Sequence, residues 1–436
     1  MSFLRFFDQR RIIGGTAILA LTQFLASAAG LVRDRLLFQT FPDLGLTDVY
    51  FAAFRPSDFL FQACIVSALG TVLVPVLAGY HARGKKEEIE KVLSATMMLG
   101  AMVFGVLGLI LALAFPWLAP HLVHFEGEQL ELYIQFGRLA LLSNFLFVFG
   151  STLGQHLITT QRYWIYGFTP ILYTAGTVGG TMFLTPSIGA YGPIVGTVIG
   201  ALVYAILRAA DVLSTGVRLR FAVWHPDFRE MGILMLPRML SLGALQIQLL
   251  VFDSLGSALE TGAISINLAA RNFESVGVGI VGIALAQAVY SPLSQAAATG
   301  DHKLYTVYLR KAIGYALLLT IPGAIALTFV SPIAARLVDL THVLPVFRVT
   351  LALYAIAIPL ESLNHLLLRA YYALKDTMLP AISTVVAGVV SILIAWRLTG
   401  TLGVHAFAIA FTAGQLTQTL GLGLFLRGRL RRMRAA

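Results

Sequence analysis

Residues 92–118, VLSATMMLGAMVFGVLGLILALAFPWL, contain no charged side chain. An α-helix of about 20 apolar residues is long enough to cross the hydrocarbon core of a bilayer. Similar apolar runs recur from end to end of the 436-residue chain, which is 58% hydrophobic and 12% charged, with a mean hydropathy of +0.81. This apolar content exceeds the roughly 45–50% of soluble domains. The sequence therefore predicts an all-α polytopic membrane protein with no large soluble domain between the spans.

Twelve apolar segments are predicted to cross the membrane. They are residues 12–38, 47–79, 92–118, 131–158, 164–185, 190–215, 230–258, 262–298, 306–337, 343–372, 376–398 and 403–426. The connections between them alternate in charge: one set carries clusters such as HARGKKEEIEK (81–91), and the other, such as EGEQLE (126–131), has almost no Lys or Arg. The positive-inside rule then places the basic connections and both termini in the cytoplasm. The net charge of +10 follows this topology pattern, so we expect no nucleic-acid partner.

The order of sequence cues repeats after about half the chain. VPVLAGYHARGKK (74–86) has an echo in SPLSQAAATGDHK (291–303), and HLITTQRYWIYGFTP (156–170) has an echo in HLLLRAYYALKDTMLP (365–380). Two lobes of six spans would insert in the same orientation, related by a pseudo-two-fold axis along the membrane normal, with a substrate site between them. We predict an N-terminal lobe (1–215), a cytoplasmic linker (216–229), a C-terminal lobe (230–426) and a basic cytoplasmic tail (427–436). Chance similarity between apolar helices is the alternative.

Charged residues inside the spans are candidates for function, because each is expensive to place in a bilayer. Arg55 with Asp58, and Arg271 with Glu274, occupy corresponding places in the two halves. A planar guanidinium donates two parallel hydrogen bonds to a phosphate, and the acid three residues later can pair with it when no substrate is bound. The alternative is a purely structural ion pair in each half. Other intramembrane charges stand singly: Asp253, Glu361, Arg138 and Arg238.

Arg33 ends the first apolar run, on the side predicted to face outward. Ala26, Ala29 and Gly30 lie on its helical face, and such a stripe of small residues permits close helix packing. We therefore expect Arg33 to point inward. The alternative is an interfacial arginine that extends to lipid headgroups. For Asp34 and Arg35 we expect solvation or local pairing.

Energy coupling leaves fewer signals in the sequence. There is no P-loop and no metal-ligand spacing, and a single cysteine, Cys64, excludes Cys-based zinc and iron–sulfur sites. No cofactor is expected, so we expect the energy for transport to come from sodium, protons or the membrane potential. Asp253, Thr412 and Gln415 carry oxygens of the kind that sodium binds. Ordinary interhelical hydrogen bonding is the alternative for these three residues.

Several segments resemble a known family. GLVRD (30–34), TDVYFAAF (47–54), VPVLAGY (74–80), GIALAQAVYSPLSQAAATGD (282–301) and RAYYALKDTMLP (369–380) are similar to the MurJ/MviN-type lipid II flippases of the multidrug/oligosaccharidyl-lipid/polysaccharide exporter superfamily. The resemblance implies two six-helix lobes round a cationic cavity, in a multi-pass protein of the bacterial cytoplasmic (inner) membrane. It implies transport of lipid II, the lipid-linked anionic precursor of peptidoglycan, from the inner to the outer leaflet during cell-wall biogenesis. It also implies contact with membrane lipids and other cell-wall synthesis proteins.

The same resemblance assigns substrate-binding roles to Arg33 with Asp34, to Asp48 and to Arg271. The chain departs from the family at Ser27, where an arginine is common, and at Phe61 and Gln62, where two arginines are expected. The sequence also leads us to expect no counterpart of the family's last two helices. A flippase for another polyprenol-linked oligosaccharide is therefore the main alternative. A small-molecule exporter of the same fold, a membrane glycosyl polymerase and a structural scaffold are further alternatives, and the first of these would require an acidic cavity.

Overall fold

The computed structural model describes residues 2–69 and 73–435, with side chains described throughout except at residues 2–17, 230, 233, 234 and 431–435. Three arginines of the predicted cytoplasmic set, Arg5, Arg10 and Arg11, lie outside the described side chains. So does most of the predicted basic tail (427–436).

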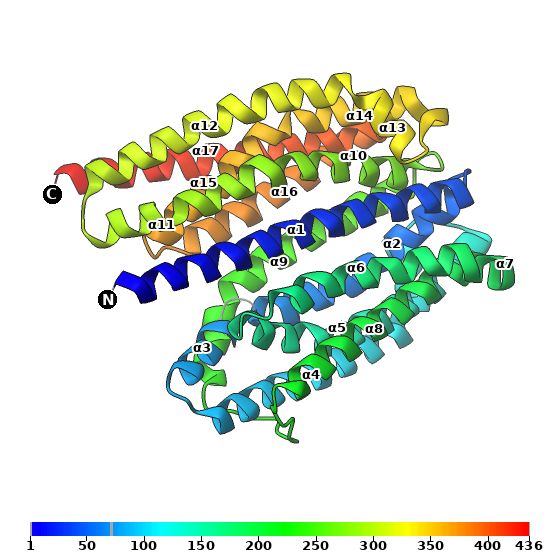
Figure 1. The fold of residues 1–436 in the computed structure, drawn as a ribbon. Coiled ribbons are helices and arrows are strands. Elements are labelled where there is room, and N and C mark those ends of the chain that lie inside the picture. Colours follow the sequence, from blue (N-terminus) through cyan, green and yellow to red (C-terminus); the bar gives the residue numbers. More distant parts are fainter. Residues whose placement is uncertain (1, 70–72, 436) are drawn as a thin grey trace. The chain divides into compact units, whose positions relative to one another are not determined.

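The described chain consists of helices joined by short connections (Figure 1). The first group of helices is α1 (Ser2–Thr40), α2 (Gly45–Phe61), η1 (Gln62–Val66), α3 (Val74–Ala82), α4 (Lys86–Leu122), α5 (Gly127–Thr159), α6 (Tyr163–Gly179), η3 (Gly180–Leu184), α7 (Thr185–Ile188), η4 (Gly189–Tyr191) and α8 (Gly192–Ser214). The second group is α9 (Phe228–Gly256), α10 (Ala263–Gly277), η5 (Val278–Ile283), α11 (Ala284–Ala298), α12 (His302–Phe329), α13 (Ser331–Leu337), η6 (Thr341–Val343), α14 (Leu344–Ala355), α15 (Ala357–Ala373), α16 (Met378–Leu402) and α17 (His405–Ala435).

Nine helical segments of the described residues are long and apolar enough to cross a membrane. One of them, Tyr163–Ser214, contains two predicted spans, α6 and α8. The other two predicted spans coincide with α1 and with α2 to α3. The prediction of an all-α polytopic membrane protein is confirmed. The pseudo-two-fold relation between lobes stays a prediction.

Two π-helical turns follow the arginines that the sequence places in corresponding positions. In η1 the turn begins at Gln62, seven residues after Arg55, and in η5 it begins at Val278, seven residues after Arg271. Such turns are rare and are frequent at functional sites. The same local irregularity therefore recurs at the same offset in the two halves of the sequence.

The described chain divides into two compact units. Unit 1 contains Met1–Pro42, Val49–His121 and Phe125–Leu242, and unit 2 contains Asp43–Asp48, Leu122–His124 and Gly243–Ala436. Helix α9 continues from one unit into the other, because the division falls after Leu242. The predicted lobe and linker boundaries stay a prediction.

Glycines hold α6 and η3 against α8 in unit 1. Gly176 and Gly180 face Gly196 and Gly200, and a Cβ added at Gly196 would lie 2.3 Å from the Gly176 carbonyl oxygen. Backbones this close require residues without side chains, as in the small-xxx-small motifs of membrane helices. A hydrogen bond between Thr177 and Thr197, with hydroxyls 2.7 Å apart, lies in the same contact. The sequence carries this signal as glycines at intervals of four.

A buried arginine ties three helices of unit 1 together. Arg208 of α8 is 2% exposed and donates to the Thr169 and Tyr204 hydroxyls and to the Gly150 and Tyr166 carbonyls. Its guanidinium also lies 4.1 Å from the Tyr204 ring centroid. Every one of these partners is neutral, so hydrogen bonds and ring faces, rather than a carboxylate, hold the charge. The sequence analysis gave Arg208 no role.

Buried tyrosines fasten the core of unit 2. The Tyr305 hydroxyl of α12 donates to the Ala370 carbonyl at 2.7 Å, and the Tyr371 hydroxyl of α15 donates to the Leu422 carbonyl at 2.9 Å. Both rings are 1% exposed or less and lie in one apolar cluster with Leu293 and Leu366. A ring buried with its hydroxyl paired fixes helix positions more specifically than an aliphatic contact does.

Candidate functional site

Arg33 lies near the end of α1 and pairs with its neighbour in sequence. Its Nε and Nη2 atoms donate to Asp34 Oδ1 at 2.9 and 2.7 Å, and the Asp34 side chain is almost fully buried. The guanidinium also lies 5.9 Å from the Phe51 ring centroid. The predicted local pairing of Asp34 is confirmed. A substrate role for both residues stays a prediction.

The small-residue explanation for the orientation of Arg33 gains no support at Gly30 and stays a prediction. A Cβ placed on Gly30 would meet no described atom within 4 Å. The described contacts therefore show no close helix packing at this glycine. The Asp34 and Phe51 contacts are the ones described for the guanidinium.

Arg55 and Asp58 are half-buried in α2, and Asp58 binds a residue that the sequence analysis missed. The Asn144 side-chain amide of α5 donates to Asp58 Oδ1 at 2.9 Å and to the Ser57 hydroxyl at 2.8 Å. Asn144 is 6% exposed. Periodicity places this asparagine inside a span but does not say which helix it faces.

Asp48 accepts three hydrogen bonds at the start of α10. Its Oδ2 accepts from the Gly262 backbone N–H at 2.6 Å, and its Oδ1 accepts from the Ser265 N–H at 2.8 Å and the Ser265 hydroxyl at 2.6 Å. A carboxylate in this place satisfies N–H groups that the helix itself leaves unpaired. Gly262 has φ +94°, and a Cβ there would meet Leu44 at 2.9 Å. The contacts of Asp48 are those of a helix cap, and its predicted substrate role is untested.

Arg271 of α10 lies between two carboxylates of unit 2. Its Nη1 pairs with Glu274, one turn further on, and its Nη2 donates to Glu361 Oε1 at 3.1 Å. The guanidinium also stacks 4.2 Å from the Phe411 ring centroid of α17. Because these contacts come from α10, α15 and α17, they fix the guanidinium from three directions.

Glu361 is the functional candidate that the sequence analysis set aside as a single charge. It lies 90 residues from Arg271, and His365 Nε2 is 3.9 Å from its Oε1. One sequence signal pointed to it: a carboxylate within a span requires a partner or a wet cavity. The sequence does not show that the partner of Glu361 is Arg271 rather than another arginine.

The three sodium candidates are not assembled into a site by the contacts described. The Thr412 hydroxyl donates to the Ala408 carbonyl at 2.8 Å, and the Gln415 side-chain oxygen accepts from the Asn364 amide at 2.7 Å. Asp253 is buried at 4% exposure. Among the side chains that the structure describes, no three of His, Cys, Asp or Glu are grouped so that they could hold a metal ion. The Ala408 bond lies within α17, and the Thr412 hydroxyl also lies 3.3 Å from the Leu353 carbonyl of α14. Hydrogen bonding within α17 and to neighbouring helices is therefore the observed role of Thr412 and Gln415.

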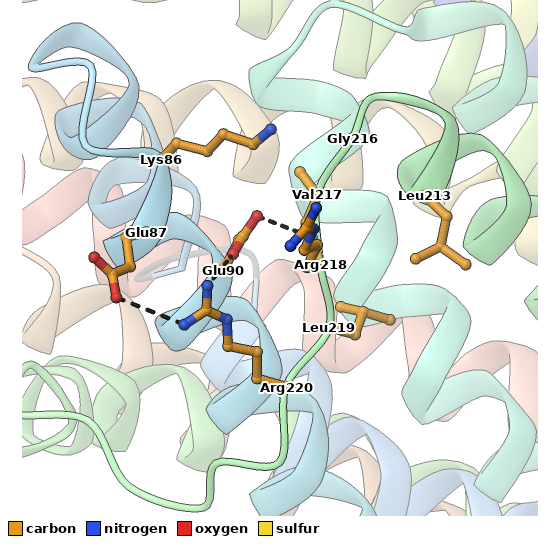
Figure 2. Close-up of a pocket in the computed structure, with 9 residues that line it drawn as sticks. All are labelled: Lys86, Glu87, Glu90, Leu213, Gly216, Val217, Arg218, Leu219 and Arg220. Atoms are coloured by element: carbon orange, nitrogen blue, oxygen red, sulfur yellow. Dashed lines mark hydrogen bonds and ion pairs between the residues drawn. The ribbon is translucent and has the colours of Figure 1, made fainter.

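An open pocket of about 1000 Å³ lies elsewhere in unit 1, where the segment after α8 runs along the start of α4 (Figure 2). Glu90, 4% exposed, accepts from the Arg218 backbone N–H at 3.0 Å and pairs with the Arg220 guanidinium at 3.3 Å. The exposed Glu87 adds a second contact to Arg220 at 3.6 Å. This pocket contains none of the predicted substrate residues, and its paired charges fasten the connecting segment to α4.

Comparison with solved structures identifies the fold. The chain matches a structure described as an inward-facing multidrug resistance MATE family transporter of the MOP superfamily, with a TM-score of 0.81, 15% identity, and coverage of 94% of this chain and 96% of that one. It also matches a lipid II flippase MurJ in an inward closed conformation, with a TM-score of 0.80, 21% identity, and coverage of 94% and 87%. Both likenesses show that this chain has the fold of these two structures.

Sequence comparison gives the family. The model for the family described as lipid II flippase MurJ matches residues 39–435. Two similar relatives are the lipid II flippase MurJ of Burkholderia cenocepacia, 25% identical over 95% of this chain and 82% of the relative, and a probable lipid II flippase MurJ of Thermotoga maritima, 24% identical over 94% and 85%. The chain belongs to the lipid II flippase MurJ family.

Proposed function

We propose that this protein moves lipid II, a peptidoglycan precursor linked to undecaprenyl pyrophosphate, from the inner to the outer leaflet by alternating access. The family match over residues 39–435 carries the proposal. A membrane transporter for a pyrophosphate-linked lipid needs cations inside its helices, and such charges are retained in membranes only where they have partners or a function.

Arginines are the proposed pyrophosphate ligands: Arg33 and Arg55 in unit 1, and Arg271 in unit 2. The planar guanidinium suits a phosphate because it donates two parallel hydrogen bonds and keeps its charge. Arg33 and Arg271 are each held by a carboxylate that an anionic substrate would have to displace. Asp34, Asp58 and Glu274 then act as charge partners of the empty carrier, and Asp48 supports the start of α10.

We place the protein in the bacterial cytoplasmic membrane with both termini in the cytoplasm, as the distribution of basic loops predicts. Two six-span lobes, 1–215 and 230–426, form the carrier in this proposal. The membrane potential supplies part of the energy, because moving one elementary charge through it changes the free energy by about 2.3 kcal/mol per 100 mV. Membrane lipids and other cell-wall synthesis proteins are the proposed partners.

Depletion of the protein tests the proposal. We expect accessibility of lipid II at the outer leaflet to fall, and wild-type protein to restore it. Arg33→Ala and Arg271→Ala should fail to restore accessibility while accumulating in the membrane at the wild-type level. Unchanged accessibility after depletion, in cells without a second lipid II transporter, would refute the lipid II assignment. If both alanine variants restored accessibility, the role of Arg33 and Arg271 would be refuted, but the lipid II assignment would not.

A flippase for another polyprenol-linked oligosaccharide is the second candidate. Ser27, Phe61 and Gln62 favour it, because the family commonly has arginines at these places and a different headgroup would need different contacts. Reconstituted protein distinguishes the two: transport of a polyprenol pyrophosphate saccharide without the peptide, at a rate equal to or above that of lipid II, would support the second candidate.

A further inference from the structure

Two aromatic side chains of the segment between α8 and α9 (215–227) are exposed. Phe221 is 83% exposed and Trp224 is 69% exposed, although unit 1, to which they belong, buries comparable rings such as Phe104. The Trp224 ring also contacts the Phe228 ring at the start of α9, with centroids 5.8 Å apart. Exposed apolar surface of this kind marks an interaction site.

The inner side of the same segment is fastened to α4 (Figure 2). Val217 and His225 are buried, at 6% and 3% exposure. The Arg220 backbone N–H donates to the Ser94 hydroxyl at 3.0 Å, and His225 Nε2 lies 3.4 Å from Glu88 Oε2. These contacts fix the segment along one helix, so the exposed rings belong to its outer side.

The contacts with α4 also give the level of each ring along that helix. Phe221 comes directly after the residue that bonds to Ser94, in the apolar run 92–118. Trp224 comes directly before the residue that meets Glu88, in the charged start of α4. Six residues of α-helix separate these two contacts, which is about 9 Å along the axis. Trp224 is therefore level with the charged end of the helix, and Phe221 with its first apolar turn.

A change from charged to apolar residues along a membrane-spanning helix marks the boundary between water and lipid, and α4 is such a helix. Tryptophan is enriched at this boundary because its amphipathic ring fits the headgroup layer. The charges beside the rings agree with this placement: Arg218, Arg220 and Arg229 are exposed, and a guanidinium binds phosphate well. Lipid is therefore the partner that fits this surface, because a soluble protein would not reach the level of the first apolar turn.

We propose that the segment between α8 and α9 is an interfacial anchor, which binds phospholipids of the bilayer. Phe221 inserts below the headgroups, and Trp224 lies among them. Arg218 and Arg229 contact the phosphate groups. The anchor keeps the start of α4 at a fixed depth, because the inner side of the segment is bonded to that helix. This inference goes beyond the proposed function and does not depend on which lipid-linked substrate is carried.

The test places one tryptophan at a time in the full-length protein and measures its depth in lipid nanodiscs. The other three tryptophans are first replaced by phenylalanine: Trp117→Phe, Trp164→Phe and Trp396→Phe. Trp224 is then the first reporter. Trp224→Phe with Phe221→Trp gives the second reporter, at the deeper position. Trp224→Phe with Lys85→Trp gives the matched control, because Lys85 is exposed and precedes α4.

Phospholipids brominated on the acyl chain close to the headgroup quench reporters that lie in lipid, and iodide quenches reporters that face water. Bromine should quench the Phe221→Trp reporter severalfold more than the Lys85→Trp reporter, with Trp224 between them, and iodide should give the reverse order. If Trp224 and the Phe221→Trp reporter were as open to iodide as the control and insensitive to bromine, the anchor would be refuted. Equal bromine quenching of these two reporters would overturn the depths assigned from α4.

Lipid selectivity tests the phosphate contacts. As a minor component, brominated phosphatidylglycerol should quench Trp224 more than the same amount of brominated phosphatidylcholine, because basic residues attract anionic lipid. Arg218→Gln with Arg229→Gln should make the two lipids equal. Arg397→Gln is the matched control: it removes an exposed arginine of α16, in unit 2, and should keep the preference. No preference in the wild type, or a preference that persists in the double variant, would overturn the role of the two arginines.

Transport of lipid II by the same variants is a separate readout. Failure of the wild type to transport lipid II would overturn the proposed function and leave the anchor in place if the bromine and iodide orders hold. Transport by the wild type with both reporters open to iodide would overturn the anchor and leave the proposed function in place.

Discussion

Replacement of Asp48 by alanine tests whether this carboxylate caps α10 or contacts substrate. The change removes the acceptor of the Gly262 and Ser265 backbone N–H groups and of the Ser265 hydroxyl. Each buried donor left unpaired costs about 1–3 kcal/mol, and loss of a helix N-cap alone costs about 0.5–2 kcal/mol. Because water can reach some of the freed groups in the variant, we expect a net loss of about 2–4 kcal/mol.

Thermal unfolding of the purified protein in detergent measures this loss. At about 2–4 °C per kcal/mol for a unit of this size, Tm should fall by roughly 4–16 °C. Ser265→Ala is the matched control: it removes the hydroxyl, with its bonds to Asp48 and to the Thr47 hydroxyl, worth about 1 kcal/mol each, and leaves both backbone bonds to Asp48 in place. An unchanged Tm in Asp48→Ala, together with lost transport, would refute the capping role and favour direct contact with substrate.

Three further changes test the packing of unit 1. Arg208→Met should lower the Tm in detergent by several degrees, because four polar groups lose their donor at a cost of about 1 kcal/mol or more each. A variant with the same Tm as the wild type would refute the conclusion that Arg208 ties the three helices together. Glu90→Gln should speed trypsin cleavage in the segment after α8 severalfold, whereas Glu87→Gln, at an exposed position, should not. Equal cleavage rates in the two variants would contradict the conclusion that Glu90 fastens this segment to α4. Gly196→Ala should strongly reduce the amount of folded protein in the membrane, since the added Cβ would lie 2.3 Å from the Gly176 carbonyl oxygen. Gly179→Ala, with no described atom within 4 Å of its Cβ, should accumulate normally.

Much of the fold could be predicted because the signals are local. A bilayer-length apolar run specifies a helix by itself, since an unpaired backbone is not tolerated in lipid. The segments predicted as spans coincide with helices, and the π-helical turns after Arg55 and Arg271 recur at the offset at which the two halves of the sequence echo each other.

The candidate site was predicted less completely. Arg271 with Glu274 could be paired from the sequence, because residues three apart share a helix face. The partners of Glu361 and Asn144 could not be predicted, since Glu361 meets Arg271, and Asn144 meets Asp58, across contacts between different helices. At Gly30 the described contacts do not test the prediction, because a stripe of small residues permits close packing but does not require it.

The sequence by itself determined that the protein is helical, that it spans a membrane many times and that it carries arginines inside those spans. Hydropathy and helical spacing are properties of neighbouring residues, so no fold is needed to read them. Only the tertiary structure decided that Asp48 caps α10, that neutral groups hold Arg208 and that Arg271 shares its charge between two acids. The physical reason is that the state of a buried charge depends on partners brought to it by packing, and those partners lie far away in the chain.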